Sequence, residues 1–548
     1  MLFNSEITMK YILIILFIFS ISCKSMDVKV FDITKYGATP NDDKDDTKAI
    51  LAILNKASAY NKAKILIPKG RFIVNSIFVK NLKNITIEGN GILCKKLDNT
   101  APVLFLDNAE NIIINNIKIE GNDIIKKKQP SGYDYNAIQF TNSKNIAVNN
   151  VEIYKMTGGG IIFFHSEDIS VLDSYFHDNH SLADIAFGYD TAKKKLNNFV
   201  AKRNKCYSNN LYGILAMGYG EKIEIEANDI KNKTQYGIIV YSLGNDLVNW
   251  SNVSILNNIV ENVSDTSPGV NDKTNSYFGM GIYCQTVMKL KIQGNKISDV
   301  LKERKEFPFR RTLPPSAISL NSCDDYQIIN NEIYNSGVDG ISMYNNDREF
   351  FAENNIISDN KISGTNAYGI YLLNAANVTL FNNTIENTRD SAIRVFHNNK
   401  FSKQVFRNIT IQKNEISSIT DGSGIELQGQ EKNKLSFINI KDNKIRKVDR
   451  FSILLVDTEN AIITNNDVKQ NYYYKGKETP YYMLQVTNSN QIEIDANKFD
   501  TDNAKPTIKS LYLDNVKTGK VTNNKINTNE KIRISNSIVV EKNNLKSE

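Results

Sequence analysis

The sequence is poor in the residue types that cross-link or kink a chain. Its 548 residues include only 5 cysteines, 10 prolines and 28 glycines. Four cysteines lie beyond residue 23, too scattered for a disulfide framework and without a CxxC pair for a metal: Cys94, Cys206, Cys284 and Cys323. We interpret them as buried thiols. Because glycine is scarce, most tight turns must use another residue, and asparagine best tolerates the left-handed backbone conformation.

No charge of one sign dominates the chain. Lys and Arg number 67 and Asp and Glu 60, a net charge of +7, and no dense basic cluster indicates a nucleic-acid partner. Hydrophobic residues make up 41% and charged residues 23%, which is typical of a folded protein. A single compact core stops growing well below this length. The choice is therefore between several domains and one elongated repetitive structure.

No apolar run is long enough to cross a bilayer comfortably. The run from Tyr11 to Phe19 follows Lys10 and ends in Ser20-Ile21-Ser22-Cys23, which is the pattern of a secretion signal over residues 1–22. The Ser22-Cys23 step resembles a bacterial lipoprotein processing site. We therefore predict an exported protein, either a cell-surface or periplasmic lipoprotein with an outer-membrane lipid anchor on Cys23, or a simply secreted one.

One phrase repeats from residue 137 onward: Gly or Ala, Ile, an alternating strand, a polar turn, a second strand and a pair of asparagines. The shortest spacings between the Gly/Ala starts are each 23 residues, as between 137 and 160, 317 and 340, and 369 and 392. A fixed period of this length predicts a solenoid with one coil per repeat. Alternation such as Ile318-Ser319-Leu320-Asn321 predicts that Ile and Leu point inward. We expect about twelve to fourteen coils at the usual strand spacing.

Asparagine pairs recur at one place in the coil, at 149–150, 330–331, 382–383 and 465–466. They predict a left-handed bend and a ladder of amide-to-amide hydrogen bonds along the stack. We therefore expect these residues to stabilise the fold and to take no part in catalysis.

The segment FDITKYGATPNDDKDDTKAILAILNKASAYNKAKILIPKGRFIV, residues 31–74, resembles the N-terminal part of the pectate lyase-like superfamily, which includes polygalacturonase relatives and phage tailspike depolymerases. Asp46 or Thr47 is expected to cap a helix whose apolar stripe contains Ile50, Leu51 and Leu54. The resemblance implies an all-β fold: a single-stranded right-handed parallel β-helix over residues 76–548, preceded by a strand and an N-terminal capping helix within residues 23–75. This superfamily hosts lyases, hydrolases, epimerases and binding proteins, so fold alone does not name the reaction.

Two insertions break the repeat, and both precede a Gly/Ala strand. They are residues 264–280 and 301–316, and we expect them to leave one corner and form a wall. Beside it, outward positions of the Gly/Ala strands carry rings and amides suited to a sugar polymer. The predicted substrate-binding residues are Tyr241, Tyr283, Gln285, Asn321, Tyr344 and Tyr371. The alternative is that these rings only reflect strand propensity.

Three candidate sets of catalytic residues follow. For β-elimination, Arg394 is the outward base or cation, with Arg311 from the basic insertion and His397 at the end of the same strand. For hydrolysis, the acids near the wall are Glu426, Asp339 and Asp390. The Asn-Thr-Asp, Gly-His-Gly and Arg-Ile-Lys motifs of polygalacturonases are missing. Farther upstream, His165 and Asp190 form a possible acid–base pair.

Calcium is a possible cofactor, because Asp339, Asp390 and Asp421 each precede a Gly/Ala strand; they equally suit turns. The leading prediction is an exported, carbohydrate-active enzyme that cleaves an acidic, uronate-containing polysaccharide by β-elimination. The alternatives are a glycoside hydrolase of the same fold and a non-catalytic glycan-binding surface protein. We expect a monomer or small homo-oligomer.

Overall fold

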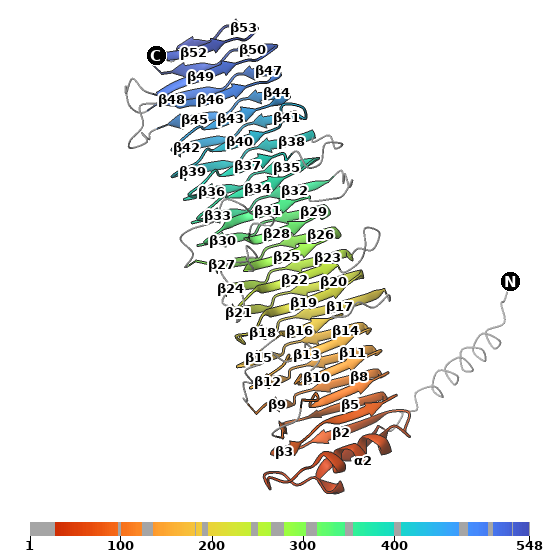
Figure 1. Ribbon diagram of the computed structural model, residues 1–548. Coiled ribbons are helices and arrows are strands. Elements are labelled where there is room, and N and C mark those ends of the chain that lie inside the picture. The colour runs from red at the N-terminus through yellow and green to blue at the C-terminus, as the bar shows by residue number, and fades with distance from the viewer. Residues whose placement is uncertain are drawn as a thin grey trace, which may run out of the picture.

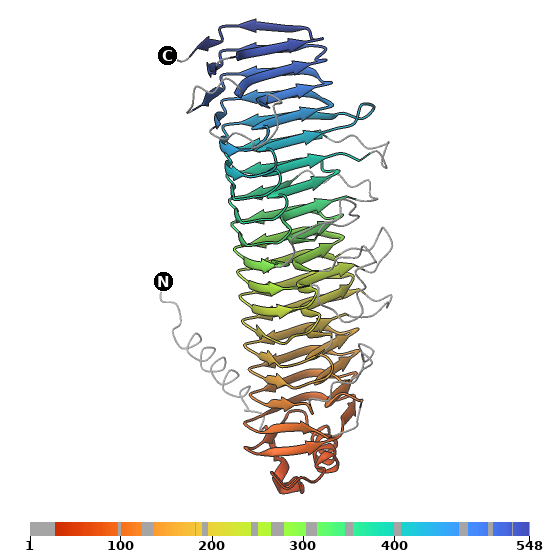
Figure 2. The same cartoon turned by 60° about the vertical axis from the view of Figure 1, so that its left-hand side comes forward.

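The computed structural model describes residues 28–96, 100–122, 135–180, 182–188, 195–242, 250–264, 279–302, 315–345, 354–398, 407–470, 481–501, 508–528 and 530–546. The chain winds into a long parallel β-helix whose three faces are the parallel sheets A, B and C. Figure 1 shows them as three columns of strands, and Figure 2 shows the length of the stack from another side. The predicted all-β solenoid is confirmed. Its coils outnumber the expected twelve to fourteen, since sheet A alone has 19 strands.

Each coil contributes one strand to sheet C, then one to sheet A, then one to sheet B. In one coil these are β28 (Ser316–Asn321), β29 (Asp324–Ile329) and β30 (Glu332–Tyr334), and the next coil starts with β31 (Asp339–Tyr344). Strand β28 pairs in parallel with β31 so that Ile318 lies beside Ile341. These partners are 23 residues apart (341 − 318), which is the predicted period.

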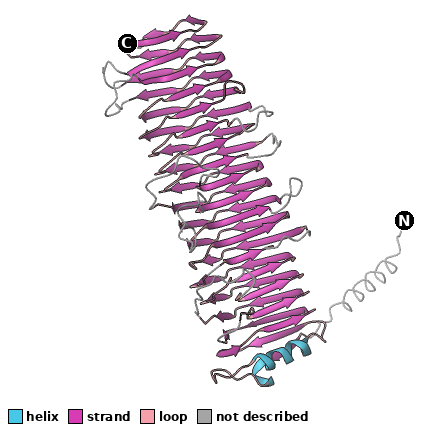
Figure 3. Cartoon of the chain, in the orientation of Figure 1, coloured by secondary structure: helices cyan, strands magenta, loops and turns pink. Residues whose placement is uncertain are grey.

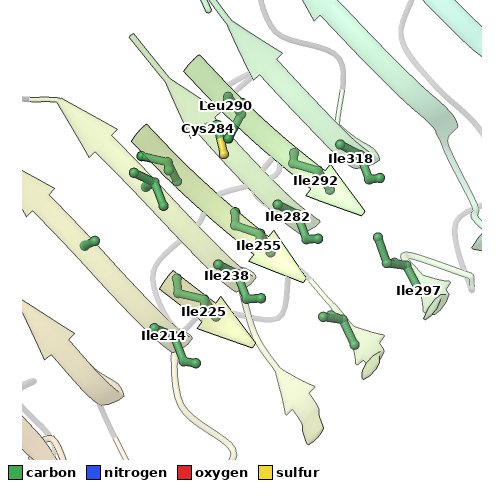
Figure 4. Close-up of a cluster of buried hydrophobic side chains, with 14 of the residues drawn as sticks. Ile214, Ile225, Ile238, Ile255, Ile282, Cys284, Leu290, Ile292, Ile297 and Ile318 are labelled. Atoms are coloured by element: carbon green, nitrogen blue, oxygen red, sulfur yellow. The ribbon is translucent and has the colours of Figure 1, made fainter. Parts of the chain in front are cut away.

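The core lies inside the coils and consists of stacked aliphatic side chains. Ile318 and Leu320 are fully buried, as the alternation predicts. Figure 4 shows Ile214, Ile238, Ile282 and Ile318 from successive sheet C strands in one row. Burying each such side chain contributes about 1.5–3 kcal/mol relative to leaving it exposed. The stack therefore has a continuous core rather than separate domains.

The asparagine pairs have the two predicted roles, one for each member. Asn330 has a left-handed φ of 54° at the bend. Asn331 is buried and donates from Nδ2 to Asn360 Oδ1 at 3.0 Å, and Asn360 donates in turn to Asn383 at 2.9 Å. This amide ladder runs from Asn204 to Asn544. The prediction of a bend with a ladder is confirmed.

The N-terminal end is closed by α2 (Thr47–Ala57), which follows β1 (Lys29–Asp32) and the short 3₁₀ helix η1 (Ile33–Tyr36). Figure 3 shows this helix in cyan at the end of the magenta strands. Its buried side chains are Ile50, Ile53, Leu54 and Ala57. The helix cap differs from the prediction. Asp45 Oδ1 accepts from the Thr47 N–H at 3.0 Å, whereas Asp46 accepts from the Thr39 N–H at 2.9 Å.

The first coils follow directly from α2: β2 (Ala63–Ile67) in sheet A, β3 (Arg71–Val74) in sheet B and β4 (Ile77–Lys80) in sheet C. Within the described ranges, no helix is both long and apolar enough to cross a membrane.

Candidate functional site

The outer face of sheet C gathers the strongest cluster of chemically active side chains. Three neighbouring strands carry it: β34 (Ile370–Leu373), β37 (Ile393–Phe396) and β40 (Ile425–Gln428). Their register aligns Tyr371 with Arg394 and Arg394 with Glu426. Because parallel strands lie about 4.8 Å apart, these outward residues form one row. They lie in the middle column of Figure 1.

Arg394 is the centre of the cluster. Its Nη1 donates to the Tyr368 hydroxyl at 2.7 Å and lies 3.6 Å from Glu426 Oε1. The side chain is 23% exposed, so the charge is partly shielded and still reachable. Burial opposes the charge on Arg394, but Glu426 and the neighbouring tyrosines outweigh it and raise its pKa. The environment therefore suits a fixed cation and disfavours the role of base that the sequence suggested.

Both carboxylate oxygens of Glu426 have partners. Oε1 faces Arg394, and Oε2 accepts a hydrogen bond from Ser391 Oγ at 2.7 Å. Ser391 Oγ is held in place because it accepts the Ser423 N–H at 3.0 Å. The Glu426 side chain is 16% exposed. These contacts fix the direction of a carboxylate that solvent can still reach.

Asp390 is a second acid beside the same cation. It is half-buried, three residues before the start of β37, and its Oδ1 accepts the Ser391 N–H at 2.8 Å. Burial raises the pKa of Asp390, and the Glu426 carboxylate adds to this, while the Ser391 N–H and Arg394 oppose it. The cluster therefore holds two acids in different environments, and burial raises the pKa of one of them.

Two tyrosines complete the cluster. The rings of Tyr368 and Tyr371 stack at 5.0 Å between centroids, and the Arg394 guanidinium lies 5.3 Å from the Tyr368 ring centre. Burial raises the pKa of the Tyr368 hydroxyl. Sequence reasoning missed Tyr368, although it directly precedes the Gly369 start of its coil. Asp339 is fully buried and accepts the Tyr368 N–H at 3.1 Å, so it positions this loop instead of facing a substrate.

The predicted groove residues also lie on sheet C. Tyr241 belongs to β22 (Tyr236–Ser242), Tyr283 and Gln285 to β25 (Met280–Gln285), Asn321 to β28 and Tyr344 to β31. However, Tyr283 is 4% exposed and Tyr344 fully buried. The expectation that these two rings line an open furrow is therefore wrong in this structure.

The reason is that outward side chains of these coils pack against one another. The ring of Tyr283 stacks on Tyr236 at 5.6 Å within an outer apolar cluster that also contains Leu215 and Ile239. The Tyr283 hydroxyl donates to Gln285 Oε1, and Asn321 Nδ2 lies 3.5 Å from that hydroxyl. The side chains of Tyr283, Gln285 and Asn321 therefore contact one another. Tyr241 is half-buried and packs against the outer apolar cluster.

The histidines do not join the Arg394 cluster. His397 is fully buried just after β37, and strand alternation places it on the opposite side from Arg394. Burial lowers its pKa to about 4. The prediction that it assists Arg394 is not supported. His165 follows β13 (Ile161–Phe164), eight strands before β37 in sheet C. Asp190 and Arg311 lie outside the described residues.

The turn aspartates proposed for calcium each have a protein partner. Asp339 and Asp390 bind backbone N–H groups, and Asp421 lies 3.0 Å from Arg450 Nη2. In the described part of the chain, no group of three or more His, Cys, Asp or Glu side chains is placed to hold a metal ion. Calcium remains a prediction.

Comparison with known proteins places the chain in a family. The family model for right-handed β-helix regions matches residues 69–230, 136–301 and 280–439, which together cover 69–439, more than half of the sequence. The chain belongs to the right-handed β-helix family. This confirms the implied handedness and the predicted membership of a right-handed parallel β-helix superfamily. No curated protein matches this β-helix protein in sequence.

Several solved structures are similar to this chain at low identity. They include an exopolygalacturonase from Thermotoga maritima, 12% identical over 77% of this chain and 87% of that one, with a TM-score of 0.34. The A-module of the Azotobacter vinelandii mannuronan C-5 epimerase AlgE6 is 11% identical over 93% and 99%, with a TM-score of 0.30. The Streptococcus pneumoniae adhesin PfbA is 12% identical over 94% and 100%, with a TM-score of 0.32. The chemistry of this β-helix protein must therefore be argued from its own side chains.

Proposed function

We propose that this β-helix protein is an exported enzyme that hydrolyses a polysaccharide, with Asp390 as general acid and Glu426 as the second carboxylate. One observation carries the proposal. Two acids from neighbouring coils both interact with Arg394, and burial raises the pKa of Asp390 while Glu426 is ion-paired. Pairs of carboxyl groups with different environments are what glycoside hydrolysis requires.

In this mechanism Asp390 donates its proton to the glycosidic oxygen as the bond to the anomeric carbon breaks. Glu426 assists attack on that carbon, and water supplies the hydroxyl group of the new reducing end. Arg394 and Ser391 keep the Glu426 carboxylate in one direction. The half-buried rings of Tyr368 and Tyr371 offer apolar surface to a sugar ring.

A polymer suits this site better than a small molecule. The cluster lies on the flat outer face of a parallel sheet, where outward residues recur at about 4.8 Å from coil to coil. An extended chain could contact several rungs at once. A small ligand would instead need the concave pocket that such ligands usually occupy.

A second candidate is β-elimination of a uronate-containing polysaccharide. It is favoured by the 2.7 Å hydrogen bond between Arg394 and the Tyr368 hydroxyl, since a phenol beside a fixed cation is a possible base for the C5 proton. The raised pKa of Tyr368 opposes this role, which is why we place hydrolysis first. A non-catalytic glycan binder is the third candidate.

The test is incubation of the purified mature protein with pectate, alginate and sulfated algal glycans. New reducing ends without absorbance from an unsaturated uronate indicate hydrolysis, and that absorbance indicates elimination. Asp390→Asn should slow cleavage by about 10²- to 10⁴-fold, and Glu426→Gln should also slow it strongly. Asp421→Asn is the matched control, because Asp421 is a turn acid of the same repeat whose partner is Arg450. If neither product forms with any glycan, the enzymatic proposal fails.

We also propose that the protein is exported and lipid-anchored through Cys23, on the signal-like pattern of residues 10–23. Labelling with radioactive palmitate in a bacterial host should mark the wild-type chain and leave Cys23→Ser unlabelled. Secretion of an unlabelled wild-type chain would contradict the anchor and leave the export proposal standing.

A further inference from the structure

Phe437 occupies a backbone position that suits asparagine. It lies in the sheet A strand β41 (Leu435–Lys441) with a left-handed φ of 56°. The corresponding residues of the neighbouring coils are Asn408, with φ 60°, and Asn460, with φ 52°. A bulky aromatic residue in this region is a genuine outlier, because its Cβ crowds the backbone. Such outliers persist where something other than local stability selects them.

Burial of the aromatic ring in the fold does not offset this backbone strain. It is 54% exposed, so it adds little to the core. It also follows a surface chain of amides, in which Asn408 Nδ2 donates to Asn377 Oδ1 at 2.7 Å. A phenyl group can neither continue nor end such a chain of hydrogen bonds. Phe437 is therefore better explained by what it offers to the outside.

Beside Phe437 lies a surface hollow of about 640 Å³, within the usual size range of ligand sites. Its floor is the outer face of β41, β44 (Thr458–Thr464), β47 (Asn490–Asp495) and β50 (Gly519–Thr522). Ile462 adds a second apolar side chain that is 44% exposed. Amide groups of Asn439 and Gln491 line the same hollow.

The polar groups of the hollow point to a neutral ligand rich in hydroxyl groups. Glu493 and Lys520 pair at 3.1 Å, so neither leaves an unbalanced charge. Asn439 Oδ1 is buried and has no hydrogen-bond partner in the structure as described. The exposed side-chain amide of Gln491, in contrast, is free to hydrogen-bond to a hydroxyl group of a ligand. An exposed ring beside amides is also the combination that binds the apolar face and the hydroxyls of a sugar.

We propose that this hollow, centred on Phe437 and Ile462, is a second, non-catalytic binding site for a neutral segment of a carbohydrate chain. A protein partner fits less well. Eleven residues line the hollow, whereas a standard protein interface needs roughly 20–30 residues on each side. The site lies on sheet A, while Arg394 lies on sheet C, so the two sites occupy different faces of the β-helix.

Its role would be to hold the protein on a polysaccharide while another segment of polymer reaches sheet C. This inference does not depend on hydrolysis at Asp390, because binding at Phe437 is expected in a catalytically inactive protein. Two weak sites on one rigid body would raise the apparent affinity for a polymer above that for a short oligosaccharide.

The test is affinity electrophoresis of the full chain in gels cast with galactan, alginate or polygalacturonate, in the Glu426→Gln background so that no gel polymer is cleaved. Phe437→Asn is the informative variant, because asparagine suits the left-handed position and should keep or raise the melting temperature. We expect it to weaken galactan retardation about tenfold. Ile113→Asn is the matched control, since Ile113 is an apolar residue of the same sheet, 39% exposed, and should leave retardation unchanged.

Three results would overturn the proposal. They are full retardation of Phe437→Asn in every gel, no retardation of the parent protein in any gel, and a change of Phe437→Asn from dimer to monomer in light scattering, which would make this face a contact between copies. Cleavage assays in the Glu426 wild-type background report separately on the sheet C site. Loss of one proposal therefore does not imply loss of the other.

Discussion

The Arg394 guanidinium donates a 2.7 Å hydrogen bond to the hydroxyl group of Tyr368, which belongs to the preceding coil. The same guanidinium lies 3.6 Å from Glu426 in the following coil. One cation thus connects three successive turns of the solenoid on its outer face. This arrangement is possible because parallel stacking places equivalent residues of neighbouring coils side by side.

Tyr368→Phe should weaken this connection without removing the ring. We expect kcat/KM on the cleaved polysaccharide to fall about 10- to 100-fold, since a hydrogen bond to a charged group is worth about 1.5–3 kcal/mol. Tyr371→Phe is the control, because it keeps the stacked ring and leaves the bond between Arg394 and Tyr368 intact. Equal effects of both variants would contradict a special role for Tyr368.

Asp390→Asn should lower kcat by about 10²- to 10⁴-fold, the usual contribution of general acid catalysis. In the wild type, activity should fall as pH rises through the raised pKa of Asp390, because the acid loses its proton. The pH profile of kcat measures this limb. A variant that keeps both the wild-type rate and this alkaline limb would show that another group supplies the proton.

Burial of His397 makes stability depend on pH. Its pKa is lowered from 6.5 to about 4, so between these values the unfolded chain binds the proton and the folded chain does not. The stability that the folded protein gains from keeping His397 neutral is therefore present above pH 6.5. It is lost as pH falls toward 4. Melting temperatures of the wild type and His397→Gln should converge as pH falls from 7 to 4. A difference that is constant over this range would contradict the prediction.

Substitutions in the amide ladder should destabilise the protein far more than substitutions in the bend beside it. Asn331→Ala removes a buried side chain that donates to Asn360 and accepts from Asn295. We expect a loss of about 2–4 kcal/mol in the free energy of unfolding, because several buried groups lose partners. Asn330→Gly keeps the left-handed backbone at an exposed site and should cost less than about 1 kcal/mol. Urea denaturation of both variants compares them.

A buried ion pair joins the coils of β16 (Ala183–Phe187) and β21 (Asp229–Lys233). Lys233 Nζ lies 2.8 Å from Asp184 Oδ2, and both side chains are fully buried. Lys233→Met should lower the free energy of unfolding by about 3–5 kcal/mol, because it leaves a buried carboxylate unpaired. The double variant Asp184→Leu/Lys233→Met should cost less than the single one. Equal losses would mean that the two charges are not coupled. Lys444→Met, at an exposed pair with Glu415, should cost under about 1 kcal/mol.

The fold could be predicted because its rules are local. A 23-residue spacing, period-two alternation around Ile318 and recurring asparagines define one coil, and each coil contacts its neighbours in the same way. The candidate site could be predicted only in part. Arg394 and Glu426 share a face because alternation assigns their direction, whereas Tyr368 lies outside the alternating strand and was missed.

The sequence by itself determined the solenoid, its inward core and the positions of its asparagine ladder, since short-range patterns dictate strand alternation and turns. Only the tertiary structure decided which outward residues are reachable. Tyr283 and Tyr344 follow the same pattern as Arg394, yet the tyrosines are buried and the arginine is partly exposed. Exposure depends on how the outward side chains of neighbouring coils pack against one another, as Tyr283 packs on Tyr236, and the pattern within one coil does not carry that information.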